Sequence, residues 1–252
     1  MKITAIILSK NEEKNIERAL RSTSFCNEII IVDDNSTDKT VEIARKFKAN
    51  ILSYKVGDDF AKARNWSMEK AQHEWILFLD SDEEVAEELK NRILKLVQDS
   101  KKAYYIKRRD FWWGRELKYG ETLKLRNKGL IRLMKKGSGS WKGSVHEEFI
   151  SNCATYEVGS LSGFINHYPH PSLREFIENI NTYSTLRALE LHNAKVKSSI
   201  FSIILYPLGK FILNYFIYLG FLDGPAGFTY AFLMSFHSFL VRGKLYQYSK
   251  ID

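Results

Sequence analysis

The sequence predicts an α/β fold with a mostly parallel sheet. In its N-terminal part, four short apolar runs rich in β-branched residues alternate with stretches of helical periodicity. Such runs are typical of strands buried on both faces, and their alternation with helices is typical of parallel sheets. Three of the runs end directly in polar residues. Because ligands bind at the carboxyl ends of parallel strands, these ends predict a shared binding crevice.

The predicted elements follow one another in regular order. Strands are expected at residues 3–8, 28–32, 51–54 and 75–79, and helices at residues 11–20, 41–47, 60–71 and 89–97. After residue 103, short aromatic and β-branched pieces punctuated by glycines predict mixed or antiparallel strands and loops over the crevice. Residues 172–193 then have the apolar spacing of an amphipathic helix.

Two strongly apolar segments follow, at residues 200–222 and 226–241. The first is long enough to span a bilayer, but Pro207, Lys210 and Asn214 interrupt it, and the second is short for a span. These features predict an interfacial or re-entrant helical pair that associates with a membrane. A helical pair buried against the rest of the protein is the alternative.

The length of 252 residues allows one substantial domain with an appended helical segment. We expect the α/β domain at residues 1–195, with halves at 1–100 and 101–171, and the helical extension at 196–252. The net charge of +8 and pI of 9.2 predict an anionic partner: nucleic acid, phospholipid headgroups or a phosphorylated substrate. Because basic residues are interspersed with the apolar C-terminal segments, a membrane surface is favoured, and no nucleic-acid partner is expected.

The cysteines and the N-terminus predict a cytoplasmic location. Cys26 and Cys153 stand in no metal-ligand or redox spacing, which indicates two reduced structural thiols. The apolar run at residues 3–8 is too short for a signal peptide. The protein is therefore expected on the cytoplasmic side, peripheral to the inner face of the membrane.

The acidic triplet Asp80-Ser81-Asp82 follows the predicted strand at residues 75–79. Two carboxylates at such a strand end can hold a divalent cation, Mg²⁺ or Mn²⁺, against a diphosphate. A solvated helix start with Asp82 as its cap is the alternative. His167 and His170 offer a third metal ligand, although a histidine near a proline turn also serves a purely structural role.

The other strand ends predict contacts to a nucleotide. Asp33 and Asp34 can accept hydrogen bonds from a ribose hydroxyl or a uracil imide, or can cap the turn that follows; we expect one role for each. Arg64, in the predicted helix at residues 60–71, can bind phosphate or a carboxylate with its planar guanidinium, or can be an exposed helix residue.

Residues 141–148 offer a candidate general base. His146 and Glu147 lie in a glycine-containing stretch next to a tryptophan, and Glu147 is the preferred group to take a proton from an attacking hydroxyl. An ordinary surface carboxylate is the alternative, since most glutamates are exposed.

Four of these motifs together resemble the family 2 inverting glycosyltransferases of GT-A fold. They are IILSKNEE at residues 6–13, VDDNSTD at 32–38, ARN at 63–65 and FLDSD at 78–82. The second half resembles a narrower branch, the lipopolysaccharide core β-1,4-glucosyltransferases, through WKGSVHE at residues 141–147 and GFLDGPAG at 220–227. With these the resemblance extends along nearly the whole chain.

The resemblance implies a UDP-sugar donor, expected to be UDP-glucose, and a lipid-linked glycan acceptor, a heptose of the lipopolysaccharide inner core. It assigns the metal and diphosphate site to Asp80 and Asp82, the base to Glu147, and donor binding to Asn11, Asp34 and Arg64. Apart from the resemblance, we expect Glu13 and Asp33 among the donor-binding residues with Asp80 and Asp82, His146 beside the base, and His167 as a further metal ligand. One departure is that the Glu-Asp pair in which many members place the base is absent here.

Three alternatives remain open at this stage. The first is a glycosyltransferase of another cell-surface glycan, such as capsule or the outer core of lipooligosaccharide. The second is a nucleotidyltransferase, but the glycine-rich basic loop that such enzymes use is missing after residues 3–8. The third is a non-enzymatic membrane-surface or nucleic-acid-binding protein, in which Trp112 and Trp113 beside Arg108 and Arg109 would stack on bases; the same aromatics fit an acceptor-sugar platform.

Overall fold

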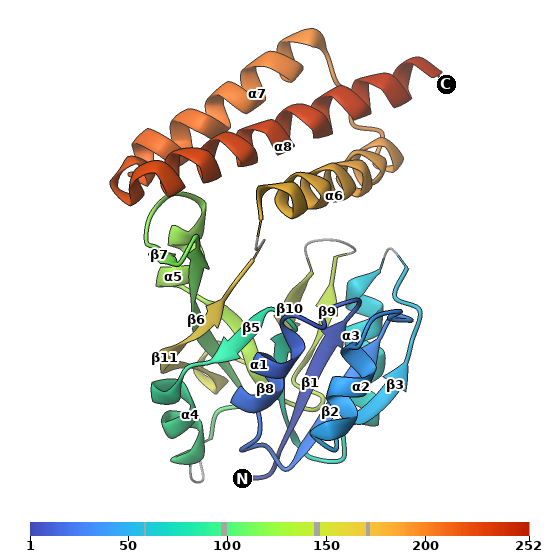
Figure 1. Ribbon diagram of the computed structural model, residues 1–252, viewed down its shortest axis with the longest axis vertical. Helices are drawn as coiled ribbons and strands as arrows, with labels where there is room; N and C mark the ends of the chain where they lie inside the picture. Colours follow the sequence, from blue (N-terminus) through green and yellow to red (C-terminus); the bar gives the residue numbers. More distant parts are fainter. Residues whose placement is uncertain (58, 97–99, 144–146, 170–171, 252) are drawn as a thin grey trace. The chain divides into compact units, whose positions relative to one another are not determined.

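The computed structural model describes residues 1–57, 59–96, 100–143, 147–169 and 172–251. The chain divides into two compact units (Figure 1). Unit 1 comprises Met1–Arg109 and Leu125–His167, and unit 2 comprises Asp110–Lys124 and Tyr168–Asp252. The predicted α/β class is confirmed in unit 1.

A mixed, mostly parallel sheet forms the framework of unit 1. Its strand order is β3-β2-β1-β4-β8-β6-β11-β5, with β7 pairing to β6. The parallel strands are β1 (Ile3–Ser9), β2 (Glu28–Asp33), β3 (Asn50–Ser53) and β4 (Trp75–Asp80). The other strands of the sheet are β5 (Glu83–Val85), β6 (Ala103–Trp112), β7 (Arg115–Leu117), β8 (Leu130–Lys135) and β11 (Val158–His167). Because β8 runs antiparallel to both β4 and β6, the expected mixed strands of the second half are confirmed.

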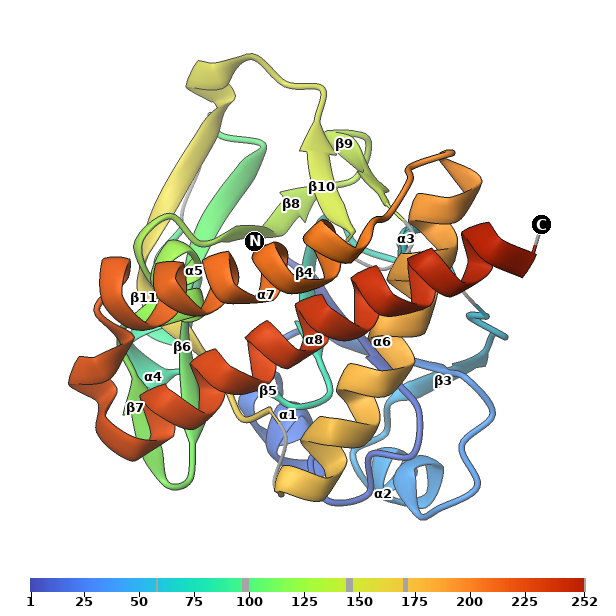
Figure 2. The same ribbon diagram turned by 90° about the horizontal axis from the view of Figure 1, so that it is seen from above.

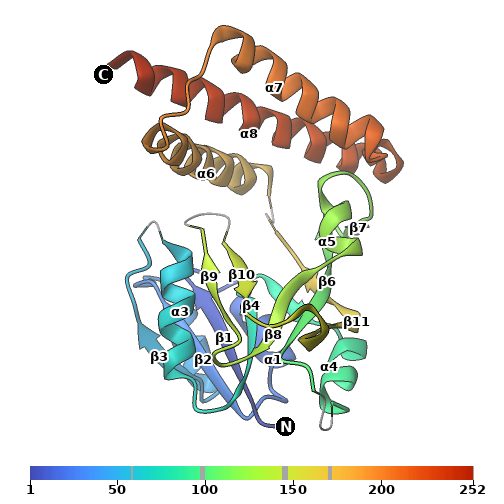
Figure 3. The same ribbon diagram turned by 180° about the vertical axis from the view of Figure 1, so that it is seen from behind.

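Two apolar cores lie on the two faces of this sheet. Alternate residues of β1 divide between them: Ile7 joins one core, and Ile6 the other, as the two-residue repeat of a strand requires. The first core includes side chains of α1 (Ile16–Ser22), α2 (Thr40–Lys46) and α4 (Glu87–Leu94). The second includes side chains of α3 (Phe60–Lys70). Figure 3 shows α3 and α4 near opposite edges of the sheet.

Most predicted elements of unit 1 are present, with one clear shift. The helix expected from residue 11 begins at Ile16, because Asn11 has a left-handed φ of 55° and the chain turns before the helix. Short elements complete this part of the chain: α5 (Leu123–Asn127), β9 (Gly139–Lys142), β10 (Glu148–Ser151) and η2 (Thr155–Glu157).

Strand register brings the three polar strand ends to one edge of the sheet. Ser9 of β1 is paired with Asp33 of β2, and Leu8 is paired with Asp80 of β4. The predicted convergence of these ends is therefore confirmed, and it defines where a ligand of the sheet would bind.

Unit 2 is helical. It contains η1 (Gly120–Thr122), α6 (Leu173–Asn193), α7 (Ile200–Ile212), the short π-helical turn η3 (Leu213–Ile217), η4 (Gly220–Asp223) and α8 (Gly224–Ile251). Helices α7 and α8 run side by side (Figure 2). By length and composition alone, Ile200–Ile217 could cross a membrane, with a mean hydropathy of 1.6. One such helix is weak evidence for a span.

The compact units differ from the domain boundary expected at residue 195. Helix α6 was assigned to the α/β domain, but its apolar side chains pack in the core of unit 2. There Phe176 and Ile180 contact Trp112 of β6 and Leu233 of α8. The amphipathic pattern of α6 indicates a buried face without indicating which element covers it, and that is why the boundary falls earlier than expected.

Candidate active site

Asp80, the last residue of β4, lies between two guanidinium groups. Its Oδ1 accepts a hydrogen bond from Nη2 of Arg64 at 2.6 Å, and its Oδ2 accepts one from Nη2 of Arg132 at 2.7 Å. Burial alone would raise the pKa of Asp80, but attraction by Arg132 and Arg64 outweighs it and holds this pKa well below its usual range. Asp80 is therefore a permanent anion with both oxygens already engaged.

Arg64 connects the acidic triplet with the candidate base. It lies on α3, is 4% exposed, and donates from Nε to Oε1 of Glu147 at 2.9 Å. Its guanidinium carbon lies 4.7 Å from the ring centroid of Trp141 and 5.4 Å from that of Phe78. These contacts rule out the alternative of an exposed helix arginine. The planar group is held in one orientation by two carboxylates and two aromatic rings.

Arg132 and Glu83 belong to the same network, and the sequence analysis missed both. Arg132, on β8, donates from Nη2 to Oε1 of Glu83 at 3.2 Å as well as to Asp80. Glu83 is fully buried, and burial raises its pKa. The negative charge of Asp80 raises this pKa further, whereas the positive charge of Arg132 lowers it. A usable signal was present, because an arginine inside the apolar run LIRLM is unusual in a buried strand.

Asp82 and His167, two of the candidate metal ligands, face each other. Nε2 of His167, the last residue of β11, lies 3.2 Å from Oδ2 of Asp82. Burial would raise the pKa of Asp82, but the charge and hydrogen bond of His167 lower it. The pKa of the neighbouring Glu12 is raised by burial and by repulsion from Asp82. The other two candidate histidines, His146 and His170, lie outside the described residues.

The residues expected to contact the nucleotide lie in the loops after β1 and β2. Asp34 accepts from Nζ of Lys10 at 2.9 Å and from the backbone N–H of Val56 at 3.2 Å. Asp33 instead accepts the backbone N–H of Ser36 and so caps its own turn. The structure thus gives Asp33 the turn role.

Asn11 and Glu13 join the same two loops to each other. Oδ1 of Asn11 accepts the backbone N–H of Thr37 at 2.8 Å. Oε2 of Glu13 accepts the backbone N–H of Lys39 at 3.1 Å. These contacts show a structural role that the sequence analysis did not predict: both side chains connect the loop after β1 to the loop after β2.

The described residues contain no group of three or more histidine, cysteine, aspartate or glutamate side chains that could hold a metal ion. The pair Asp82 and His167 brings one carboxylate oxygen and one imidazole nitrogen within 3.2 Å of each other. Around Asp80, three buried N–H groups have no acceptor among the described residues: Nη1 of Arg64, Nη1 of Arg132 and Nε1 of Trp141. Because buried donors are normally paired, these atoms point to an acceptor supplied by a ligand or by water.

A mostly parallel sheet with acidic residues, arginines and a paired glutamate at its strand ends is the arrangement of a GT-A sugar-transferring enzyme. The family model "Glycosyl transferase family 2" matches residues 4–159, and the chain belongs to this family. The protein is therefore an enzyme, a glycosyltransferase.

Individual proteins agree with this assignment. An uncharacterized glycosyltransferase of Rickettsia typhi is 29% identical over 98% of this chain and 88% of that protein. The lipopolysaccharide core biosynthesis glycosyltransferase LpsC of Rhizobium meliloti is 27% identical over 97% of this chain and 92% of that protein. Among solved structures, glucosyl-3-phosphoglycerate synthase of Mycobacterium tuberculosis in complex with Mn²⁺, UDP and phosphoglyceric acid matches 79% of this chain and 80% of that chain, with a TM-score of 0.50 and 16% identity. This last likeness shows the fold alone.

Proposed function

We propose that this glycosyltransferase transfers a hexose, expected to be glucose, from a UDP-sugar to a heptose of the lipopolysaccharide inner core, with inversion at the anomeric carbon. The observation that carries the proposal is the double contact of Arg64, which binds Asp80 of the strand-end triplet and Glu147 at once. Arg64 thereby joins residues from both halves of unit 1, which supports a single site. The likeness to LpsC, whose name includes lipopolysaccharide core biosynthesis, supports the acceptor class.

The three unpaired donors around Asp80 support diphosphate binding. A nucleoside diphosphate would supply the acceptors that Nη1 of Arg64 and Nη1 of Arg132 lack. Asp80 holds both guanidinium groups in place, and so it prepares positive charge where the leaving group develops negative charge. Asp34 binds the nucleoside. Its neighbours Asn11, Glu13 and Asp33 shape the loops around it.

A divalent metal, Mg²⁺ or Mn²⁺, fits the triplet through Asp82 rather than through Asp80. Both oxygens of Asp80 are engaged by arginines, whereas Asp82 and His167 present an oxygen and a nitrogen to each other, a ligand pair that suits Mn²⁺. When bound, such an ion would neutralise part of the charge on the departing diphosphate. The solved structure with Mn²⁺ and UDP described above supports a divalent metal as the cofactor.

Glu147 is the proposed general base. Its Oε1 is held by Arg64, its side chain is 13% exposed, and Oε2 has no hydrogen-bond partner among the described residues. One oxygen is therefore oriented and the other is available to accept the proton of an acceptor hydroxyl. Arg64 positions the base, and His146 beside it in the sequence stays a secondary candidate.

The acceptor assignment places the reaction at the inner face of the cytoplasmic membrane, because an inner-core acceptor is attached to lipid. In unit 2, Trp113 is 49% exposed and stacks on Trp112 with ring centroids 4.3 Å apart, an aromatic surface that suits a sugar ring. The experiment is mass spectrometry of lipopolysaccharide from a strain that lacks the gene. Loss of one hexose from the inner core supports the proposal, and an unchanged core with another glycan truncated would replace this acceptor by that glycan.

A further inference from the structure

The outer face of α7 is an apolar surface that no other described element covers. Six side chains recur on one side of the helix, since residues four apart share a face. They are Ile200, Phe201, Ile204, Leu205, Leu208 and Ile212, each between 43% and 71% exposed. No residue of α7 is buried. A continuous apolar stripe of this length is uncommon on a monomeric surface and marks a site of contact with a membrane or another molecule.

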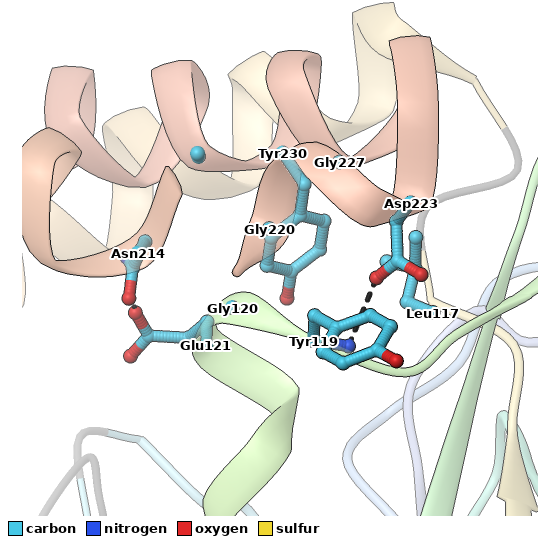
Figure 4. Close-up of a pocket in the computed structure, with 10 residues that line it drawn as sticks. Leu117, Tyr119, Gly120, Glu121, Asn214, Gly220, Asp223, Gly227 and Tyr230 are labelled. Atoms are coloured by element: carbon cyan, nitrogen blue, oxygen red, sulfur yellow. Dashed lines mark hydrogen bonds between the residues drawn. The ribbon is translucent and has the colours of Figure 1, made fainter. Parts of the chain in front are cut away.

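The charged residues of the helical hairpin formed by α7 and α8 are paired with other groups of unit 2. Between Ile200 and Val241 the only charged side chains, apart from His237, are Lys210 and Asp223. Nζ of Lys210 lies 2.7 Å from a carboxylate oxygen of Glu121. Asp223 accepts the backbone N–H groups of Lys118 and Tyr119, each at 2.9 Å, and Figure 4 shows the bond to Tyr119. Both charges are thus compensated inside unit 2, and the outer face of α7 carries none.

Two glycines, Gly220 and Gly227, allow the backbone segments between α7 and α8 to approach each other closely. A Cβ on Gly227 would lie 2.0 Å from the carbonyl oxygen of Gly220, and a Cβ on Gly220 would lie 2.6 Å from that of Asn214. The amide nitrogen of Asn214 in turn donates to Glu121 at 2.7 Å, and Figure 4 shows these two side chains pointing toward each other. The GFLDGPAG segment therefore serves to pack α8 against the turn that follows α7. Its polar contacts lie on the inner side of the hairpin.

Positive charge accompanies the apolar face. Lys195 and Lys197 are exposed in the loop that precedes α7. The guanidinium of Arg242 lies 3.9 Å from the ring centroid of Tyr206, which places a further cation beside this helix. The only acidic residues from position 194 to the end of the sequence are Asp223, already paired with backbone N–H groups, and Asp252. An apolar stripe bordered by cations complements an anionic lipid surface.

We propose that unit 2 docks in the plane of an anionic phospholipid bilayer. The outer face of α7 enters the boundary between headgroups and acyl chains, and Lys195, Lys197 and Arg242 meet headgroup phosphates. An in-plane position follows from the inner contacts, because a spanning α7 would carry the Lys210–Glu121 pair and its loop into the hydrocarbon. This proposal depends on the proposed function in one respect only: a lipid-linked acceptor would lie at the membrane surface to which unit 2 binds.

Vesicle flotation tests the proposal directly. The full chain is mixed with vesicles of phosphatidylcholine alone or of phosphatidylcholine with phosphatidylglycerol. The double variant Phe201→Glu/Leu205→Glu should lower binding to the anionic vesicles by at least about tenfold, because each substitution replaces an apolar side chain that would insert into the bilayer. The matched control is Leu94→Glu/Tyr156→Glu in unit 1, at residues 54% and 78% exposed; it should bind as the wild type does.

Other outcomes would overturn the proposal. Equal binding of both double variants would show that the α7 face is not the contact. Equal binding of the wild type to neutral and anionic vesicles would remove the role of the cations. Protein that resists carbonate extraction from the vesicles would indicate a membrane-spanning helix. If light scattering shows a dimer that dissociates in the variant Phe201→Glu/Leu205→Glu, the α7 face would instead bind a second copy of the chain.

A parallel readout separates this proposal from the proposed function. Release of UDP from a UDP-sugar in lipid-free buffer reports on unit 1, and Phe201→Glu/Leu205→Glu should leave it unchanged while vesicle binding is lost. If no UDP-sugar is consumed by any variant but flotation still separates the two double variants, the docking surface stands and the proposed function fails.

Discussion

Replacing Arg132 by methionine should destabilise the protein by about 3 kcal/mol at neutral pH, because the half-buried Asp80 and the buried Glu83 would lose the guanidinium between them. Nη2 of Arg132 lies 2.7 Å from Asp80 and 3.2 Å from Glu83. Each carboxylate keeps a second partner: Arg64 at 2.6 Å for Asp80, and Arg108 at 3.6 Å for Glu83. Since removing one partner of a buried pair typically costs about 3–5 kcal/mol, the remaining partners place the effect at the lower end.

The cost should depend on pH in a defined direction. The pKa of Glu83 is raised in the folded protein above its ordinary value of 4.5, because the side chain is buried, and removing Arg132 raises it further. A group with a raised pKa favours folding below its unfolded pKa, and that contribution is lost as the pH rises through the folded pKa. Arg132→Met should therefore be most costly near neutral pH, and the difference from the wild type should shrink toward about pH 4.5.

Urea unfolding followed by tryptophan fluorescence measures this effect. The matched control is Lys135→Met on the same strand β8, where the ammonium lies 3.3 Å from the exposed Glu74 and the expected cost is below about 1 kcal/mol. Adding Glu83→Gln to Arg132→Met should recover about 1–2 kcal/mol, since the unpaired charge is removed. The reasoning is refuted if Arg132→Met costs no more than Lys135→Met, or if its cost is the same at both pH values.

Two further predictions concern other parts of the chain. The Cys26 side chain is half-buried, and burial raises the pKa of its thiol to about 12. In a Cys153→Ser background, iodoacetamide should therefore modify Cys26 much more slowly in the native protein than after unfolding; equal rates would contradict the raised pKa. Gly227→Ala should destabilise unit 2 strongly because its Cβ would meet the carbonyl oxygen of Gly220, whereas Gly209→Ala on α7, with nothing within 4 Å of a new Cβ, should be neutral or stabilise by up to about 1 kcal/mol. Equal melting temperatures of the two alanine variants would refute the close packing.

The strand-end residues could be predicted from local sequence because each follows an apolar strand directly. Asp34 and Asp80 needed no knowledge of the fold beyond a parallel sheet, and the observed register brings their strands together. Glu147 was predicted from the character of its loop. The sequence analysis assigned Glu147 and Arg64, 83 positions apart, to one site, but it did not predict the contact between them.

Contacts made through the antiparallel half of the sheet could not be predicted from the sequence. Arg132 meets Asp80 only because β8 pairs with β4, and the two residues are 52 positions apart. No local signal specifies which strand lies beside β4. The same reason explains the displaced domain boundary: the apolar stripe of α6 is visible in the sequence, but its partner α8 lies far along the chain.

The most direct test of the central claim is a donor assay in which purified enzyme is incubated with UDP-glucose and Mn²⁺, and released UDP is measured beside UDP binding. Glu147→Gln should bind UDP as the wild type does but lower turnover by at least about a hundredfold, because general-base catalysis contributes about 10²–10⁴-fold. Asp82→Ala should lose the response of UDP binding to the metal. Wild-type turnover in Glu147→Gln, or unchanged metal dependence in Asp82→Ala, would contradict the site described here.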